Sequence, residues 1–121
     1  MSEASLYYVY DPMCSWCWGY HNTWEKLQDL LAEEFADSLQ IQSVLGGLAP
    51  DSNEPMPDDL QKMLQNTWAR IHAQLGTEFN FDFWTKCQPK RSTYPACRAV
   101  LVAREQGLEK KCIMPFNMVI I

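Results

Sequence analysis

The sequence predicts an α/β fold in which a strand-helix-strand unit is followed by further helices. Two short runs of β-branched and aromatic residues, at 6–10 and 39–45, flank a stretch of apolar residues at helical spacing. Two more helical patterns come after them. Strands joined through a helix form a βαβ unit, which is expected to be parallel and right-handed. A chain of 121 residues is long enough for one modest core, so we expect a single domain.

The first strand is expected at 6–10, a buried run closed by Asp11 and Pro12, which are typical of a turn. A helix is expected from residue 14 to about 36–38, because aromatic and leucine side chains recur there at spacings of three or four. The second strand is expected at Leu39–Leu45 and ends at a pair of glycines.

The second half of the chain is expected to be helical. Residues 49–56 hold two prolines among polar residues and form a loop, after which Pro57 suits the first turn of a helix that ends at Gly76. An aromatic cluster at 79–84 occupies a short or irregular segment. A last helix, opened by a Ser-Thr pair, ends at Gly107. These helices suggest a cap, whose core the aromatic cluster is expected to form.

The composition excludes several classes of function. A formal charge of -5 argues against nucleic acid, whose phosphates attract Lys and Arg. No run of about 20 apolar residues suggests a membrane span, and the first 20 residues lack the pattern of a secretory signal. We therefore expect a soluble, cytoplasmic protein. Five cysteines without a regular framework do not suggest a disulfide scaffold in that compartment.

The motif Cys14-Ser15-Trp16-Cys17 is the candidate site, since it falls between a strand end and a helix. Cys14 is expected at the helix N-terminus, where free N–H groups and the positive end of the dipole stabilise a thiolate. Cys17, one turn further on, is expected to be buried and protonated until it resolves a mixed disulfide. These positions predict dithiol-disulfide exchange, with Cys14 attacking and Cys17 resolving.

Neighbouring residues are candidates for tuning the thiol or contacting substrate, namely Ser15, Trp16, Asp11 and Pro12. Asp11 is favoured as a turn residue, with relay of a proton to Cys17 as the alternative. Trp16 is expected to be exposed, whereas Trp18 and Tyr20 either form an apolar rim around the dithiol or pack in the core. His21 is favoured as a solvated surface residue over a role in assisting Cys17.

A zinc half-site is the alternative explanation of a Cys-x-x-Cys motif. Zinc needs a second pair of ligands, yet Cys87 and Cys97 are nine residues apart and the two histidines are far from each other in sequence. No metal is therefore predicted. Cys87 and Cys97 are expected to be small buried side chains, with a second redox pair as the less favoured alternative.

Three segments resemble one known family. They are 8–19 (YVYDPMCSWCWG), 79–84 (FNFDFW) and 91–99 (RSTYPACRA). All three are similar to the DsbA-like thiol-disulfide oxidoreductases, in particular to their cytoplasmic FrnE-type branch. The resemblance covers the chain from Leu6 to about Gly107.

The resemblance implies a thioredoxin-like α/β fold with a helical insertion and assigns Cys14 as the attacking and Cys17 as the resolving cysteine. It implies protein thiols or disulfides, or glutathione, as partners, with no nucleic acid, no membrane and no cofactor. The related kappa-class glutathione transferases and chromene-carboxylate isomerases typically have serine at the position of Cys14. A glutathione-dependent isomerase or transferase is therefore an alternative function, with a less good match.

Family members continue through a strand preceded by a cis-proline loop, another strand and a final helix. We therefore expect an incomplete domain, organised as a βαβ redox unit over 1–48, a helical insertion over 57–110 and an atypical tail over 111–121. The tail lacks helical periodicity, and permissible codons from Lys110 onward, read in another frame, encode a peptide that resembles the family's next helix. A C-terminal truncation through a frameshift near Lys111 is thus expected, and a catalytically inert remnant is the second alternative function. An open sheet edge favours self-association, unless Met118 to Ile121 cover it.

Overall fold

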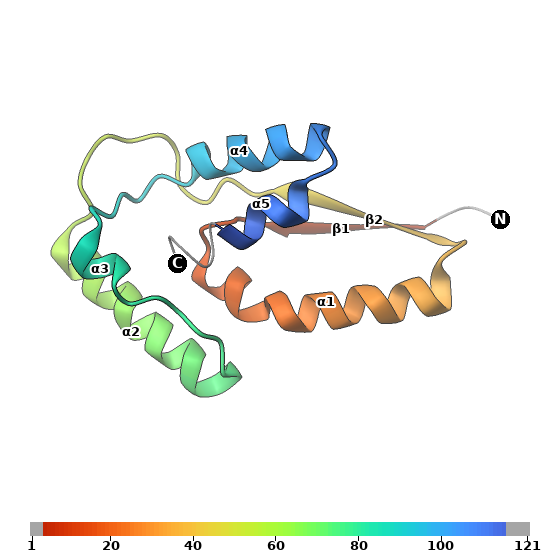
Figure 1. Cartoon of the computed structure of the whole chain (residues 1–121), viewed down its shortest axis with the longest axis horizontal. Coiled ribbons are helices and arrows are strands. Elements are labelled where there is room, and N and C mark those ends of the chain that lie inside the picture. Colours follow the sequence, from red (N-terminus) through yellow and green to blue (C-terminus); the bar gives the residue numbers. More distant parts are fainter. Residues whose placement is uncertain (1–3, 116–121) are drawn as a thin grey trace.

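The computed structural model describes residues 4–115, which contain a two-stranded sheet and five helices (Figure 1). The elements in chain order are β1 (Ala4–Tyr10), α1 (Ser15–Phe35), β2 (Leu39–Leu45), α2 (Asp58–Leu75), α3 (Phe83–Lys86), α4 (Tyr94–Glu105) and α5 (Glu109–Pro115). β1 and β2 are parallel, with Ala4 opposite Leu39 and Tyr10 opposite Leu45. The predicted βαβ unit is therefore confirmed. No helix in the described part of the chain is both long and apolar enough to span a bilayer.

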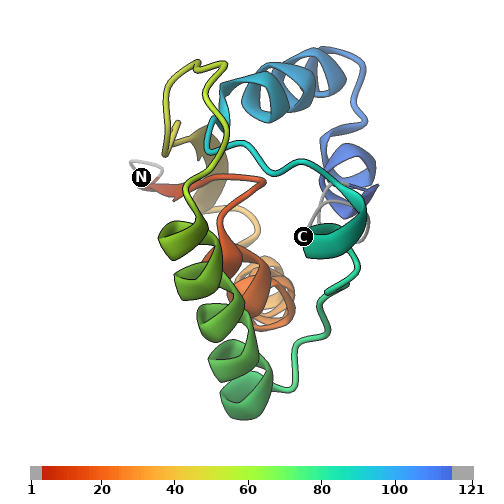
Figure 2. The same cartoon turned by 90° about the vertical axis from the view of Figure 1, so that its left-hand side faces the viewer.

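Helices α1, α4 and α5 contact the same face of the sheet, with α1 below the strands and α4 above them in Figure 1 (Figures 1 and 2). α1 packs against β1 through Trp24, whose ring stacks on Tyr8 with centroids 4.0 Å apart. The prediction that β1 is a buried strand is wrong for one of its faces, since Tyr7 is 59% and Val9 61% exposed. Alternate strand residues point to opposite faces, and within 4–115 only the face bearing Tyr8 and Tyr10 is well covered.

α2 crosses the beginning of α1 at close range (Figure 2). Gly19 allows this approach, because a Cβ atom at its position would lie 2.6 Å from Cγ2 of the fully buried Ile71. The helix ends as predicted at Gly76, which adopts a left-handed conformation with φ of 71° and donates its N–H to His72 O. This crossing places the second half of α2 beside the first turns of α1.

The C-terminal region differs from the prediction. α5 continues through Lys111 to Pro115, so a helix crosses the boundary expected at 110. The apolar periodicity of this segment is weak and did not indicate a helix. Within the described residues β1 pairs with β2 alone, as expected for an open edge. The proposed covering of that edge by 118–121 lies outside the described residues.

Candidate functional site

Cys14 lies at the N-cap of α1, in the turn that follows β1. The turn is closed by the Cys14 N–H, which donates to Asp11 O at 3.1 Å, and the helix begins with the Trp18 N–H donating to Cys14 O at 3.1 Å. No side chain caps the helix by a hydrogen bond, so the N–H groups of its first turn are available to the Cys14 sulfur. This is the placement predicted from the sequence.

The two thiols are electrostatically asymmetric. The Cys17 thiol donates a hydrogen bond to the Cys14 sulfur and, with the N–H groups of Cys17 and Trp16, lowers the pKa of Cys14 to about 6. The same hydrogen bond and burial raise the pKa of Cys17. Both side chains are half-buried, so the expectation that Cys17 is buried is wrong. The hydrogen bonds to the Cys14 sulfur, rather than depth, distinguish the pKa values of the two thiols.

Asp11 is a buried carboxylate beside the dithiol, with only 4% of its surface exposed. Its Oδ1 accepts the Met13 N–H at 2.8 Å, which is the turn contact expected from the sequence. Its Oδ2 accepts the Leu48 N–H at 2.9 Å and faces the Cys97 thiol at 3.6 Å. Asp11 therefore also ties the turn to the loop after β2 and to α4. Its negative charge raises the pKa of both thiols of the motif.

The remaining cysteines occupy different environments. Cys97 is buried as predicted, and burial, together with the charge of Asp11, raises the pKa of its thiol. Cys87 is exposed, which corrects the expectation that it is buried, because it follows the short helix α3 at the surface. None of the five cysteines is in a disulfide. Sequence reasoning missed the contact between Cys97 and Asp11, which are 86 residues apart.

Side chains of α2 contact the two residues between the cysteines. The Ser15 Oγ accepts a hydrogen bond from the Trp68 Nε1–H at 2.8 Å. Trp16 is 43% exposed, as expected, and the Arg70 guanidinium lies 5.9 Å from the centroid of its ring. Pro12 is fully buried. Trp68 and Arg70 are contacts of the site that the sequence did not suggest, since Trp68 lies 53 positions after Ser15 in the chain.

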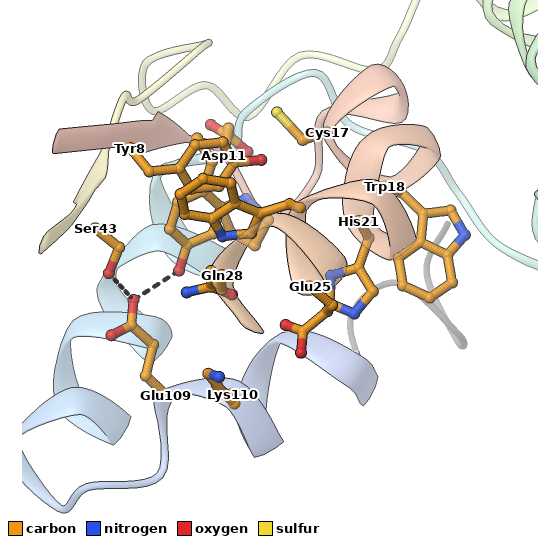
Figure 3. Close-up of a pocket in the computed structure, with 13 residues that line it drawn as sticks. Tyr8, Asp11, Cys17, Trp18, His21, Glu25, Gln28, Ser43, Glu109 and Lys110 are labelled. Atoms are coloured by element: carbon orange, nitrogen blue, oxygen red, sulfur yellow. Dashed lines mark hydrogen bonds between the residues drawn. The ribbon is translucent and has the colours of Figure 1, made fainter. Parts of the chain in front are cut away.

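The two thiols open onto different hollows. Cys17 lines a cavity of about 100 Å³ together with Trp18 and His21, whose rings stack with centroids 5.2 Å apart (Figure 3). His21 is half-buried there, so the prediction of a solvated surface histidine is wrong. The sequence left Trp18 and Tyr20 open between rim and core, and they are half-buried and 39% exposed respectively.

Cys14 instead lines a groove of about 270 Å³ between the turn and α2. The groove is lined mainly by methionine, leucine and aromatic side chains, with two cations. The lining residues used below are Met56, Leu60, Met63, Lys90 and Arg91. Thioether side chains adapt to ligands of varied shape, so this surface suits apolar groups next to an exchanging sulfur.

The chain is similar to solved structures of known proteins. No family model matches the chain, and no curated protein matches it. A crystal structure from Nitrosomonas europaea, of a protein provisionally assigned as a protein disulfide isomerase, has a TM-score of 0.69 and 28% identity over 98% of this chain. The cytosolic disulfide reductase DsbM from Pseudomonas aeruginosa, in a structure with GSH, has a TM-score of 0.63 and 22% identity over 94% of this chain.

The matches cover 53% and 55% of those two proteins, so the chain spans about half the length of each. The 22% identity to DsbM shows likeness of fold alone. Together with the βαβ unit and the helices that follow β2, the two structures confirm the fold that the sequence resemblance implied. The chain has a partial thioredoxin-like fold, similar to that of these two proteins.

Proposed function

We propose that this chain carries out thiol-disulfide exchange through Cys14 and Cys17. The observation that carries the proposal is the arrangement of the two thiols, in which Cys14 lies at the N-terminus of α1 and accepts a hydrogen bond from Cys17. A pKa of about 6 leaves most of Cys14 ionised at neutral pH, and the thiolate is the form that attacks disulfides. The βαβ unit over 1–48 then supplies the redox pair, and the helices over 57–110 shape its surroundings.

The exchange proceeds in two balanced steps. The Cys14 thiolate attacks one sulfur of a substrate disulfide, forms a mixed disulfide and releases the other substrate sulfur as a thiolate. Cys17 then loses its proton to the solvent, and its thiolate attacks the Cys14 sulfur, which forms the Cys14–Cys17 disulfide and releases the second substrate thiolate. The substrate gains two electrons and the dithiol loses two. The reverse sequence oxidises a substrate dithiol with the same residues.

The groove beside Cys14 supports protein thiols or disulfides as substrates, with glutathione as a second partner. Its apolar lining, which includes Met56, Leu60 and Met63, suits side chains that flank a substrate cysteine. Lys90 and Arg91 lie in the same groove and suit a carboxylate, a group that glutathione also carries. DsbM, one of the two similar structures, is described with GSH and as cytosolic. We accordingly propose a cytoplasmic setting, in which a dithiol of this kind is kept mostly reduced.

The test is the mass of the purified chain with and without reductant and alkylation, followed by turnover of insulin and of glutathione disulfide. We expect a reversible change of two protons and turnover that Cys14→Ser abolishes. A dithiol that oxidises and alkylates freely but turns over neither substrate would contradict the proposal. That result would favour the alternative of a catalytically inert remnant, a protein that keeps the thiol pair without its enzymatic use.

A further inference from the structure

The first turns of α1 are attached to α2 and to the loop after it by side-chain contacts. Trp68 donates its Nε1–H to Ser15 Oγ at 2.8 Å, in the first turn. Farther along, the Trp18 Nε1–H donates to Glu78 O at 3.0 Å, and the Thr77 hydroxyl donates to Gly19 O at 3.4 Å. Of these three hydrogen bonds, the one from Trp68 reaches a residue between the two cysteines.

Trp68 is a rigid donor. It is 3% exposed, and its ring centroid lies 4.9 to 6.0 Å from those of four other aromatic residues. These residues are Phe79, Phe81, Phe83 and Trp84. A side chain packed in this way has little rotamer freedom, so the position of its N–H is determined by the cluster. The hydroxyl of Ser15 therefore meets a donor whose position does not adapt to it.

Ser15 is the first residue of α1, directly after Cys14. The N–H groups of the next two residues, Trp16 and Cys17, are among those that stabilise the Cys14 thiolate. Their directions depend on the backbone of this turn, which the hydrogen bond from Trp68 to Ser15 ties to α2. A loosened first turn would spread those N–H groups over several directions and stabilise the thiolate less.

We propose that Trp68 is a positioning residue for thiol-disulfide exchange. By holding Ser15, it holds the first turn of α1 so that the N–H groups of that turn face the Cys14 sulfur. The inference rests on the proposed function for its catalytic meaning, but its effect on Cys14 is measurable without turnover.

The test is the pH profile of Cys14 alkylation by iodoacetamide, followed by mass spectrometry on the full chain. Trp68→Phe keeps most of the packed ring and removes the N–H, so we expect the pKa of Cys14 to rise and its reactivity at pH 6 to fall about two- to tenfold, as for the loss of one hydrogen bond. Ser15→Ala removes the acceptor from a small side chain outside the core, and we expect the same shift. In the double variant the shift should be no larger than in either single variant.

Trp84→Phe is the matched control. Trp84 belongs to the same aromatic cluster, and its Nε1–H is buried without a partner among the described residues. We expect its pH profile to coincide with that of the unmodified chain. Equal shifts in Trp68→Phe and Trp84→Phe, or no shift in Ser15→Ala, would overturn the proposal, because the effect would then come from the cluster's packing.

Reaction of the unmodified chain with glutathione disulfide, measured beside the alkylation profiles, separates the role of Trp68 from the proposed function. If the unmodified chain forms no Cys14–Cys17 disulfide with glutathione disulfide while the alkylation profiles shift as expected, the proposed function fails and the role of Trp68 stands. If exchange occurs but the profiles of all variants coincide, the proposed function stands and the role of Trp68 is refuted.

Discussion

Two polar clusters lie near the C-terminal end of β1 and differ in how their charges are balanced. The thiol cluster consists of Asp11, Cys14 and Cys17, at the turn after β1. The carboxylate cluster consists of Tyr10, Ser43, Arg104 and Glu109, where α4 and α5 meet the sheet. The residues of the thiol cluster are close in sequence, whereas those of the carboxylate cluster come from distant parts of the chain. Both clusters are partly buried.

In the carboxylate cluster every charge has an opposite partner. Arg104 donates to both oxygens of Glu109, at 2.8 and 3.0 Å. Tyr10 donates to Oε1 of Glu109 at 2.8 Å, as does Ser43 (Figure 3). Burial opposes ionisation of Glu109, but the hydrogen bonds from Arg104, Tyr10 and Ser43 prevail and lower its pKa. Burial and the bond to Glu109 raise the pKa of Tyr10. Tyr10, Arg104 and Glu109 are therefore each held in one protonation state, which suits a structural clamp.

In the thiol cluster the ionised groups have the same sign. Asp11 lies beside two thiols without an arginine or lysine in the cluster, and its charge raises both of their pKa values. Hydrogen bonds from Cys17 and from the helix N-terminus nevertheless lower the pKa of Cys14 to about 6. The comparison shows that Glu109 is stabilised by an opposite charge, whereas the groups that lower the pKa of Cys14 are a thiol and backbone N–H groups. A strongly perturbed pKa of the second kind marks a candidate functional site.

The strongest test of this contrast is Cys14→Ser, which we expect to reduce exchange with insulin or glutathione disulfide to the uncatalysed background. A serine hydroxyl is not ionised at neutral pH and does not form a disulfide. The measurement is turnover per mole of folded chain, with Cys87→Ser as the control, because Cys87 is exposed and lies after α3. Comparable activity in the Cys14 and Cys87 variants would refute the assignment of Cys14.

Removal of the Cys17 thiol, the proposed resolving thiol, should make Cys14 a weaker nucleophile. In Cys17→Ala the sulfur of Cys14 loses the donor that lowers its pKa most, so the pKa should rise from about 6 toward its ordinary value. At pH 6 we expect alkylation of Cys14 to be at least about tenfold slower in the variant than in the unmodified chain. This difference in rate should shrink above pH 9, where Cys14 is ionised in both proteins. A mixed disulfide with glutathione should accumulate. An unchanged alkylation profile would mean that the helix N-terminus alone lowers this pKa.

The carboxylate cluster should respond in stability and leave Cys14 unchanged. Glu109→Gln removes the charge that Arg104 pairs with, in a site where the Glu109 side chain is 20% exposed, and we expect a loss of about 1–2 kcal/mol in the free energy of unfolding. Because the folded pKa of Glu109 is lowered, its contribution is complete above pH 4.5 and is lost as the pH falls below that value. Urea titrations at pH 7 and pH 3 measure both effects. An equal difference at the two pH values would contradict the ionic origin.

The smallest effect is expected at the surface pair of Lys86 and Asp82. Their side chains are 73% and 65% exposed, and a 3.2 Å contact between such groups is screened by water and salt. Lys86→Ala should change the free energy of unfolding by less than about 0.5 kcal/mol. This variant is the reference for the urea titrations. A larger loss of stability would show that partial burial does not explain why the Arg104–Glu109 pair contributes more than the Lys86–Asp82 pair.

The secondary structure of the first half of the chain was largely predictable from local pattern. The strand before Asp11, the helix after Cys14 and the second strand were confirmed, because spacing and turn residues act over a few positions. The helix Glu109–Pro115 was not predicted, since a short segment with weak periodicity depends on its contacts. One such contact is the bond between Glu109 and Tyr10, which joins residues 99 positions apart.

The sequence by itself determined the positions of the two cysteines relative to a helix N-terminus, because the motif spacing and the preceding turn are local properties. It also indicated the DsbA-like class from three short segments. Only the tertiary structure decided that Asp11 faces Cys97 and that Trp68 reaches Ser15. The physical reason is that pKa values and side-chain hydrogen bonds depend on atoms within a few ångströms, and the chain brings those atoms together from positions 53 and 86 residues apart.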